Sequence, residues 1–233
     1  QFHQMTHTPA YEIAVALQAR LVYWCKAPAY CDDLPQHYTR YSVAFYKEAP
    51  RVNYATIKYC DIANGTGVRT SLFVSGCRRH CPECFNAVAW DFGYGLPFDK
   101  AVRNEILGSL APDYIDGLSL FGGEPFEPEN QRALVPFLHE VRVLYPHKTI
   151  WCYTGNVYET ELLQPSHARC EVTDEMLSLI DVLVDGEFIP AQHDISLRFR
   201  GSGNQRIIDL NATRAAGHTV LWQDDPLFAD HKM

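Results

Sequence analysis

The chain reads Val68-Arg69-Thr70-Ser71-Leu72-Phe73-Val74-Ser75-Gly76-Cys77-Arg78-Arg79-His80-Cys81-Pro82-Glu83-Cys84-Phe85 at the point where an apolar strand enters a cysteine-rich loop. The apolar and β-branched residues before Gly76 are typical of a buried strand. Cys77, Cys81 and Cys84 then follow with C-x3-C-x2-C spacing. Three thiolates this close together can bind three irons of a cubane iron–sulfur cluster, and the motif gives the fourth iron no protein ligand. The loop therefore predicts a cluster with one iron open for chemistry.

Zinc is an alternative metal for the same loop. Zinc takes four ligands, often from paired C-x2-C units, and the segment 81–84 is one such unit that His80 or Cys60 could complete. No second C-x2-C or H-x3-H unit follows in the sequence, so the spacing favours the cluster. A secreted disulfide framework is disfavoured, because three of the eight cysteines fall within eight residues. The other cysteines lack ligand-like spacing and are given no role: Cys25, Cys31, Cys60, Cys152 and Cys170.

The composition is that of an ordinary soluble domain. Of the 233 residues, 47% are hydrophobic and 21% are charged, which is enough for one sizeable core. The formal net charge of -8, with no basic stretch to offset it, argues against non-specific binding of nucleic acid. No apolar run approaches the length of a membrane span, and the first residues lack the order of a signal peptide. A reducing cytoplasm, which preserves thiolates, is the expected compartment.

Strands and helices alternate along the chain after Val52. Strands are expected at 68–75, 118–121, 149–153, 182–184, 206–210 and 218–222, and helices at 98–110, at 128–144, around 174–180 and from Asn211. Asn156, with Glu159 three residues later, is expected to cap a further helix. Such alternation predicts a mostly parallel sheet with right-handed crossovers, whose site lies at the carboxyl ends of the strands.

Four turns follow expected strands and should meet at that edge of the sheet. They are the cysteine loop, Gly122-Gly123, Thr154-Gly155-Asn156 and Asp185-Gly186. A glycine pair after a strand lets the backbone approach a ligand closely and leaves amides free to donate, although a plain turn has the same appearance. Asp185 is expected to face the same pocket. The Gly- and Arg-rich segment 196–205 is either a solvated loop or a segment that binds substrate or closes the site.

Several of these segments resemble known motifs. The cysteine spacing, with Phe85 directly after the last cysteine, resembles the signature of radical S-adenosylmethionine (SAM) enzymes, and Gly122-Gly123-Glu124 resembles their GGE motif. The stretch 64–69 is similar to the N-G-x-G-x-R sequence of the glycyl-radical-activating branch, with Thr66 where proline is usual. Nearly everything from Val52 onward resembles the anaerobic ribonucleoside-triphosphate reductase-activating proteins.

This resemblance implies a fold, two cofactors and a partner. The fold would be α/β, a partial open (β/α)6 barrel of the radical SAM type. Cys77, Cys81 and Cys84 would ligate a [4Fe-4S] cluster, with no catalytic residue beyond these ligands, and SAM would be placed by Glu83, Cys84, Phe85, Gly122, Gly123 and Glu124. The enzyme would be cytoplasmic and anaerobic. It would take an electron from a flavodoxin-like donor, cleave SAM reductively, and generate a glycyl radical on the catalytic subunit of the reductase.

Other functions stay open at this point. An activase of another glycyl-radical enzyme, such as pyruvate formate-lyase, would share both cofactors and the reaction. A small-molecule radical SAM enzyme, such as a carboxy-deazaguanine synthase, would need a closed substrate pocket. A zinc-binding interaction module would have no catalysis at all.

Residues 1–51 have no counterpart in the resemblance. The chain begins with Gln rather than Met, and these residues show no clear strand-turn-helix unit. They are interpreted either as an N-terminal extension or as upstream sequence read in frame, with translation starting at Val52. Residues 52–233 are expected to form the radical SAM activase domain.

Overall fold

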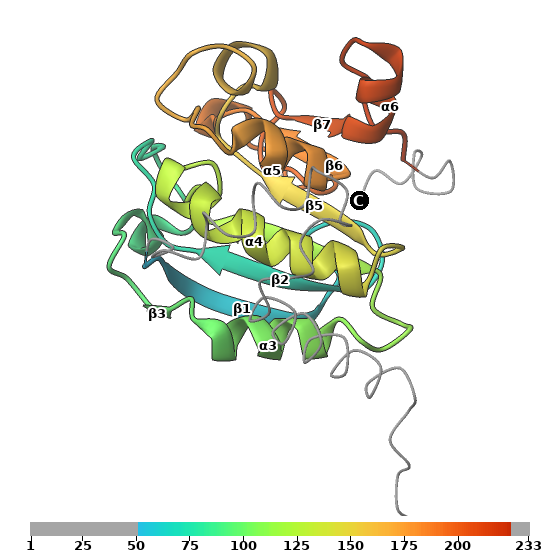
Figure 1. Ribbon diagram of the computed structural model, residues 1–233. Coiled ribbons are helices and arrows are strands. Elements are labelled where there is room, and N and C mark those ends of the chain that lie inside the picture. Colours follow the sequence, from blue (N-terminus) through green and yellow to red (C-terminus); the bar gives the residue numbers. More distant parts are fainter. Residues whose placement is uncertain (1–50, 225–233) are drawn as a thin grey trace, which may run out of the picture. The chain divides into compact units, whose positions relative to one another are not determined.

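The computed structural model describes residues 51–224 (Figure 1). The expected extension therefore lies outside the described residues except for Arg51, as do Cys25 and Cys31. No helix in the described range is both long enough and apolar enough to cross a membrane.

The fold is built on an open, mixed sheet of seven strands in the order β3-β1-β2-β4-β5-β6-β7. The strands are β1 (Asn53–Asp61), β2 (Arg69–Val74), β3 (Leu96–Pro97), β4 (Gly117–Gly122), β5 (Thr149–Tyr153), β6 (Val182–Asp185) and β7 (Arg206–Asp209). The central strands β2, β4, β5 and β6 are parallel. Both edges are antiparallel, with β1 between β2 and β3 on one side and β7 beside β6 on the other. The protein is thus an α/β fold whose parallel strands lie at the centre.

The sequence predictions hold for the centre of the sheet and fail at its edges. A strand at 218–222 is wrong, because Leu221 makes only an isolated bridge to Ile208. The strand β1 was not expected. It lies next to the two-residue edge strand β3, most of its residues are partly or fully exposed, and its register shifts against β2, so its apolar pattern is weak. The antiparallel direction of β7 was also not expected. The segment 186–205 that connects β6 to β7 contains a single 3-10 turn and no α-helix that would return the chain for a parallel strand.

The helices begin and end close to where the sequence places them. They are α3 (Lys100–Ser109), α4 (Pro128–Leu144), α5 (Thr173–Leu179) and α6 (Leu210–Ala216), with 3-10 turns η1 (Ala87–Trp90) and η3 (Pro190–Gln192) and a π-helical turn η2 (Tyr158–Leu162). Asp99 caps α3 by accepting from the Val102 amide at 3.0 Å, and Pro128 opens α4. The expected Asn156 cap is wrong. Its side chain is fully buried and binds Thr154 Oγ1 and Arg79 instead.

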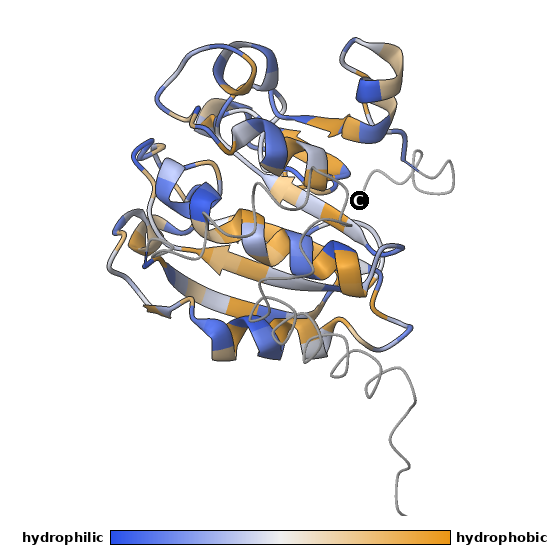
Figure 2. Cartoon of the chain, in the orientation of Figure 1, coloured by the Kyte–Doolittle hydropathy of each residue, from blue (hydrophilic) through white to orange (hydrophobic). Residues whose placement is uncertain are grey.

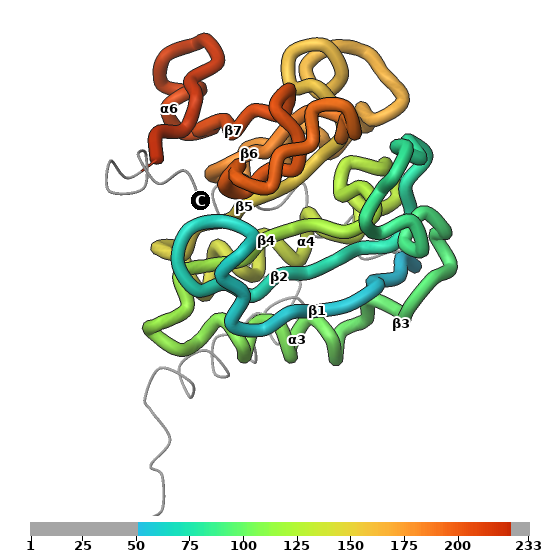
Figure 3. The backbone as a smooth tube through the Cα atoms, turned by 180° about the vertical axis from the view of Figure 1, so that it is seen from behind, coloured from blue at the N-terminus to red at the C-terminus, as the bar shows by residue number. Residues whose placement is uncertain are grey.

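The two faces of the sheet have different neighbours. Figures 1 and 3 show α4 and α5 on the same face, while the strands lie in front when the molecule is seen from behind. Side chains alternate between the faces of a strand, so Leu118 and Leu120 of β4 point one way and Phe121 the other. Figure 2 shows the apolar residues concentrated on the strands and on α4. The opposite face carries a second apolar cluster around Trp151, against which Phe199 packs.

A buried arginine joins the amino-terminal ends of three parallel strands. Arg69 of β2 is fully buried and donates to Ser119 Oγ at 2.8 Å, to the Leu118 carbonyl at 2.8 Å and to both oxygens of Thr149 at 2.8 and 2.9 Å. A fifth bond reaches the Thr66 carbonyl at 3.0 Å. Burial lowers the pKa of Arg69 to about 10, so the side chain stays protonated at neutral pH. This one side chain satisfies acceptors on β4, on β5 and in the loop before β2.

We expect Arg69→Met to destabilise the fold by about 3 kcal/mol or more, because it leaves several buried acceptors without a donor. Urea unfolding followed by tryptophan fluorescence measures the change. The matched control is Arg103→Met on α3, which removes a partly exposed ion pair with Glu140 at 3.6 Å and should change stability by no more than about 0.5 kcal/mol. Equal stability of the two variants would contradict the structural role given to Arg69.

Candidate active site

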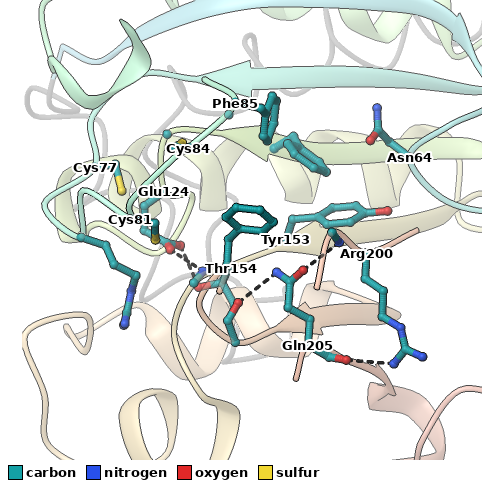
Figure 4. Close-up of a pocket in the computed structure, with 18 of the residues that line it drawn as sticks. Asn64, Cys77, Cys81, Cys84, Phe85, Glu124, Tyr153, Thr154, Arg200 and Gln205 are labelled. Carbon is teal, nitrogen blue, oxygen red and sulfur yellow. Dashed lines mark hydrogen bonds between the residues drawn. The ribbon is translucent and has the colours of Figure 1, made fainter. Parts of the chain in front are cut away.

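A cavity of about 490 Å³ lies at the carboxyl ends of the parallel strands (Figure 4). Its volume is within the usual range of small-molecule sites, roughly 300–1,000 Å³. The four turns expected to converge do so here, because the cysteine loop, Gly122-Gly123, Thr154-Gly155 and Gly186 all line it. Asp185 does not line it, which corrects the expectation from the sequence. That carboxylate is buried and binds the Arg206 guanidinium and the Tyr158 amide.

The cysteine loop curls so that all three thiols reach this cavity. Gly76 and Cys77 donate their amides to the carbonyls of Ala89 and Trp90 at 2.8 and 3.1 Å, which ties the start of the loop to η1. His80 and Glu83 adopt left-handed backbone conformations, with φ of 51° and 56°. These two residues directly precede Cys81 and Cys84, and they turn the chain sharply at each. Cys77 is buried, and the other two thiols are half-buried.

The Cys77 and Cys81 thiols are poorly suited to being charged in the absence of a metal. Burial raises the pKa of Cys77 to about 11, and the nearby Glu124 carboxylate adds to the shift. Burial also raises the pKa of Cys81, against which the Arg79 charge acts in the opposite direction. Bound metal cations deprotonate coordinating thiols outright. The site therefore has the donor atoms of a metal centre, but the thiols need the positive charge of a bound metal to ionise to thiolates.

The two candidate metals make different demands on this loop. A zinc ion would draw four ligands to about 2.0–2.3 Å from one centre. In a cubane cluster each cysteine binds a different iron, so three cysteines can hold the cluster while one iron stays open. Among the residues that the structure describes, no group of three or more Cys, His, Asp or Glu side chains is placed to hold one metal ion.

Three buried donors in the cavity wall have no acceptor. Within residues 51–224, six buried side-chain nitrogen or oxygen atoms lack a hydrogen-bond partner, and three of them belong to residues lining this cavity: Arg79 Nε, Trp90 Nε1 and Tyr153 Oη. Burial raises the pKa of Tyr153 well above its ordinary value, so the hydroxyl keeps its proton. Unpaired buried donors are costly, and they call for a ligand rich in acceptors. The sulfur atoms of a cluster and the polar groups of SAM are acceptors of this kind.

The glycine turn brings β4 against the cysteine loop. Gly122 has a φ of 113°, and a Cβ on Gly123 would lie 2.5 Å from the Gly76 carbonyl oxygen, so both positions require glycine. The amides of this turn are not free, contrary to expectation. Gly123 donates to the Val74 carbonyl at 2.7 Å and Glu124 to the Gly76 carbonyl at 2.8 Å. The turn therefore offers carbonyl oxygens, which suit an ammonium group, rather than amides.

Glu124 holds two of the turns together. Its buried carboxylate accepts from the Phe126 amide, the Thr154 hydroxyl and the Gly155 amide, each at 2.8 Å. Asn130 of α4 donates to the Glu124 and Ser75 carbonyls at 2.9 and 3.0 Å, which extends the link to the end of β2. Burial raises the pKa of Glu124 to about 7. Glu124 lies in the cavity wall as expected, but its carboxylate is occupied by protein donors.

The segment 196–205 forms the far wall of the cavity. Leu197, Phe199, Arg200 and Gly201 line it, together with Gln205. The Gln205 side chain accepts from the Gly201 amide at 2.8 Å and donates to the Gly186 carbonyl at 3.0 Å, and Arg200 donates to the Gln205 carbonyl at 2.8 Å (Figure 4). These bonds favour a role at the site over that of a solvated loop.

Every SAM-binding residue expected from the sequence borders the cavity, together with residues that the sequence analysis missed. Glu83, Cys84, Phe85, Gly122, Gly123 and Glu124 all line it, although their contacts with SAM stay a prediction. The missed residues include Arg79, Trp90 and Tyr153. Arg79 lies between two of the cysteines expected to bind the cluster, and Tyr153 directly precedes a turn at the site. Their positions in the sequence could therefore have predicted that both line the cavity.

We expect the stability contributed by Glu124 to fall as the pH rises. Its pKa is raised on folding from 4.5 to about 7, so the folded state holds the proton more tightly, and this contribution is greatest below the unfolded pKa. Between pH 5 and pH 8 it should fall by about 2 to 3 kcal/mol. Urea unfolding at both pH values compares the wild type with Glu124→Gln, which cannot titrate. Glu105→Gln, at an exposed position on α3, is the control and should keep the pH dependence of stability that the wild type shows. If Glu124→Gln also kept this pH dependence, the role assigned to Glu124 would be wrong.

Comparison with known proteins agrees with this site. Residues 63–208 match the family model of a 4Fe-4S single cluster domain. The chain is 40% identical over 158 residues to the anaerobic ribonucleoside-triphosphate reductase-activating protein of Haemophilus influenzae, which covers 67% of this chain and 97% of that protein. The protein of the same name from Escherichia coli K12 is 40% identical over 156 residues, or 66% and 96% of the two chains. That of enterobacteria phage T4 is 35% identical over 156 residues, or 67% and 93%.

The resemblance drawn from the cysteine loop and the glycine turn is thereby confirmed. The matched region spans the loop before β2, the cavity and the strands that carry it. The chain belongs to the family of anaerobic ribonucleoside-triphosphate reductase-activating proteins, with a 4Fe-4S single cluster domain at residues 63–208.

Proposed function

We propose that this protein is a radical SAM activase that generates a glycyl radical on the catalytic subunit of anaerobic ribonucleoside-triphosphate reductase. The observation that carries the proposal is the convergence of three thiols, a glycine turn and unpaired buried donors on one cavity. Membership of the activating-protein family supports the same reaction and both cofactors, a [4Fe-4S] cluster and SAM. The name of the relatives supports the identity of the partner.

The residues of the cavity fit these two cofactors. Cys77, Cys81 and Cys84 would hold the cluster. The carbonyls of the turn at Gly122-Gly123 would receive the ammonium group of SAM, since the amides of Gly123 and Glu124 are already engaged. When bound, the reduced cluster supplies the electron that cleaves the C5′–S bond of SAM, which enables hydrogen abstraction from a glycine of the partner.

The remaining residues of the wall orient the ligands and exclude water. Phe121 and Tyr153 pack with ring centroids 4.1 Å apart and planes 44° apart on the cavity face of β4 and β5, and Phe85 meets Phe121 edge-on at 5.7 Å. The hydrogen bond from Gln205 to Gly186 ties the far wall to the end of β6. Aromatic side chains on this wall help to keep solvent from reactive species. Glu124 keeps the turns of β4 and β5 in register beneath the ligands.

A protein partner suits the rim of the cavity. Phe85 lines the cavity yet is 75% exposed, and Val88 and Ile195, from segments that border the cavity, are also exposed. Apolar side chains at the mouth of a site are common where another protein docks. We propose that a glycine-bearing loop of the reductase enters here and that a flavodoxin-like protein donates the electron, both in an anaerobic cytoplasm.

We also propose that the fold is a partial (β/α)6 barrel. The sheet is open, and its parallel strands β2, β4, β5 and β6 carry the site at their carboxyl ends. This is the arrangement expected of a partial (β/α)6 barrel of the radical SAM type, with residues 52–233 as the activase domain. An open sheet leaves room for a protein loop to reach SAM, which a closed barrel would obstruct.

We expect Cys77→Ser, Cys81→Ser and Cys84→Ser each to abolish assembly of the [4Fe-4S] cluster. A serine oxygen is a poor substitute for a thiolate on iron. Anaerobic reconstitution followed by iron and sulfide analysis and by absorption near 400 nm, roughly where such clusters absorb, measures the loss. The matched control is Cys60→Ser, since Cys60 is exposed and lies outside the cavity, and it should load as the wild type does. Full loading of all three ligand variants would overturn the assignment of the site.

We also expect the reconstituted protein to activate the reductase. The enzyme is mixed anaerobically with SAM, a reductant and the catalytic subunit, and electron paramagnetic resonance is recorded. A glycyl-radical doublet on the reductase, with 5′-deoxyadenosine released, is the expected result. Release of 5′-deoxyadenosine without a radical on this partner would leave the chemistry intact and show that the proposed partner is wrong.

A further inference from the structure

One of the unpaired donors in the cavity wall belongs to the cysteine loop, and a second belongs to the turn η1, which is hydrogen-bonded to the start of that loop. Arg79 lies between Cys77 and Cys81 in sequence, and Trp90 accepts the Cys77 amide on its backbone carbonyl at 3.1 Å. The Arg79 Nε and Trp90 Nε1 atoms are both buried, and neither has an acceptor within the described chain. Both residues line the cavity that contains all three thiols.

The fold holds Arg79 so that only its Nε is left without a partner. Its Nη2 donates to Asn156 Oδ1 at 2.8 Å and to Glu161 at 2.7 Å, and Nη1 lies 3.8 Å from Glu187. A Cβ at Gly155 would come within 2.6 Å of Arg79 Cδ, so the stem of the side chain passes closely over that turn. The terminal nitrogens are thus engaged by protein groups. The Nε–H is the donor of this cavity-lining side chain for which the described chain supplies no acceptor.

Trp90 is held just as firmly, by its ring and its backbone. Its indole stacks on His80 of the cysteine loop, with ring centroids 4.6 Å apart and planes 24° apart. The ring also borders a second, open concavity on the other side of Cys77. The indole is thus packed against His80 of the loop, while its N–H finds no acceptor within the described chain.

We propose that Arg79 Nε and Trp90 Nε1 donate hydrogen bonds to sulfur atoms of the cluster, either its sulfides or the thiolates that bind it, and thereby raise its reduction potential. This inference rests on the proposed function, since it requires the cluster at Cys77, Cys81 and Cys84. Reduction adds negative charge to the sulfurs, and N–H donors stabilise that charge more in the reduced state. The positive charge of Arg79 acts in the same direction, although Glu161 and Glu187 offset part of it.

The first test is the midpoint potential of the cluster in the SAM-free holoprotein, followed by the electron paramagnetic resonance signal of the reduced cluster. Trp90→Phe removes only the N–H and keeps an aromatic ring against His80. Arg79→Lys keeps the charge but loses the Nε donor. Each should lower the equilibrium constant for one-electron reduction by about tenfold, which corresponds to about 59 mV. Trp222→Phe and Arg78→Lys are the controls, since neither residue lines the cavity, and both should keep the potential of the wild type.

A second measurement detects the proposed contact directly in the wild-type protein. The wild-type holoprotein is prepared with indole-15N tryptophan, and pulsed resonance on the reduced cluster should detect coupling to 15N and to a deuteron exchanged from D2O. The 15N coupling should persist in Trp222→Phe and vanish in Trp90→Phe. Wild-type potentials in both loaded cavity variants, or no 15N coupling in the wild type, would overturn this inference. If those samples still load the cluster and cleave SAM, only the hydrogen bonds proposed here are wrong and the proposed function stands. A wild-type protein that binds no cluster would overturn both the hydrogen bonds and the proposed function.

Discussion

The site depends on one buried carboxylate. Glu124 accepts three hydrogen bonds, from the chain just after the β4 turn and from two groups of the β5 turn, and its own carbonyl is linked through Asn130 to the end of β2. The ends of three neighbouring parallel strands are thereby fixed relative to one another at the place where the ligands must meet. Without this link, each turn would be held only by its own strand. Burial raises the pKa of this carboxyl, because removing a carboxylate from water disfavours its charged form. The fold accepts this desolvation in exchange for a side chain that organises the floor of the cavity.

Two buried ionisable side chains, Arg69 and Glu124, organise opposite ends of the parallel strands. From the start of β2, Arg69 donates to acceptors at the amino-terminal ends of β4 and β5. At the carboxyl ends of these strands, the Glu124 carboxylate accepts from donors of the turns. Neither forms an ion pair with the other, and each is stabilised by neutral hydrogen-bonding groups. The strands are therefore aligned at one end independently of the turns at the other. Loops of the site can differ in sequence while the sheet that carries them stays the same.

The sequence predicted what is set by local pattern and missed what is set by tertiary contact. The central strands, α4 and the converging turns follow from apolar periodicity and from glycine and proline placement. Asn156 was misread because its cap-like spacing does not reveal that Arg79, far away in sequence, competes for its side chain. Asp185 was misread because Arg206 lies on an antiparallel neighbour whose direction no local pattern specifies. The free amides expected at Gly122-Gly123 were wrong because the close approach of Gly76, which glycine permits, consumes them.

The cavity is incomplete as a protein structure and becomes complete only with its ligands. Protein interiors leave few buried donors unpaired, yet half of the unpaired atoms in the described chain gather around this one cavity. The buried thiols have the opposite need, since they resist ionising until a metal supplies positive charge. An iron–sulfur cluster answers both requirements at once, because its irons stabilise the thiolates and its sulfurs accept from N–H groups. The same residues would therefore stabilise the loaded cavity, and binding of the cluster would be coupled to the stability of the fold around it.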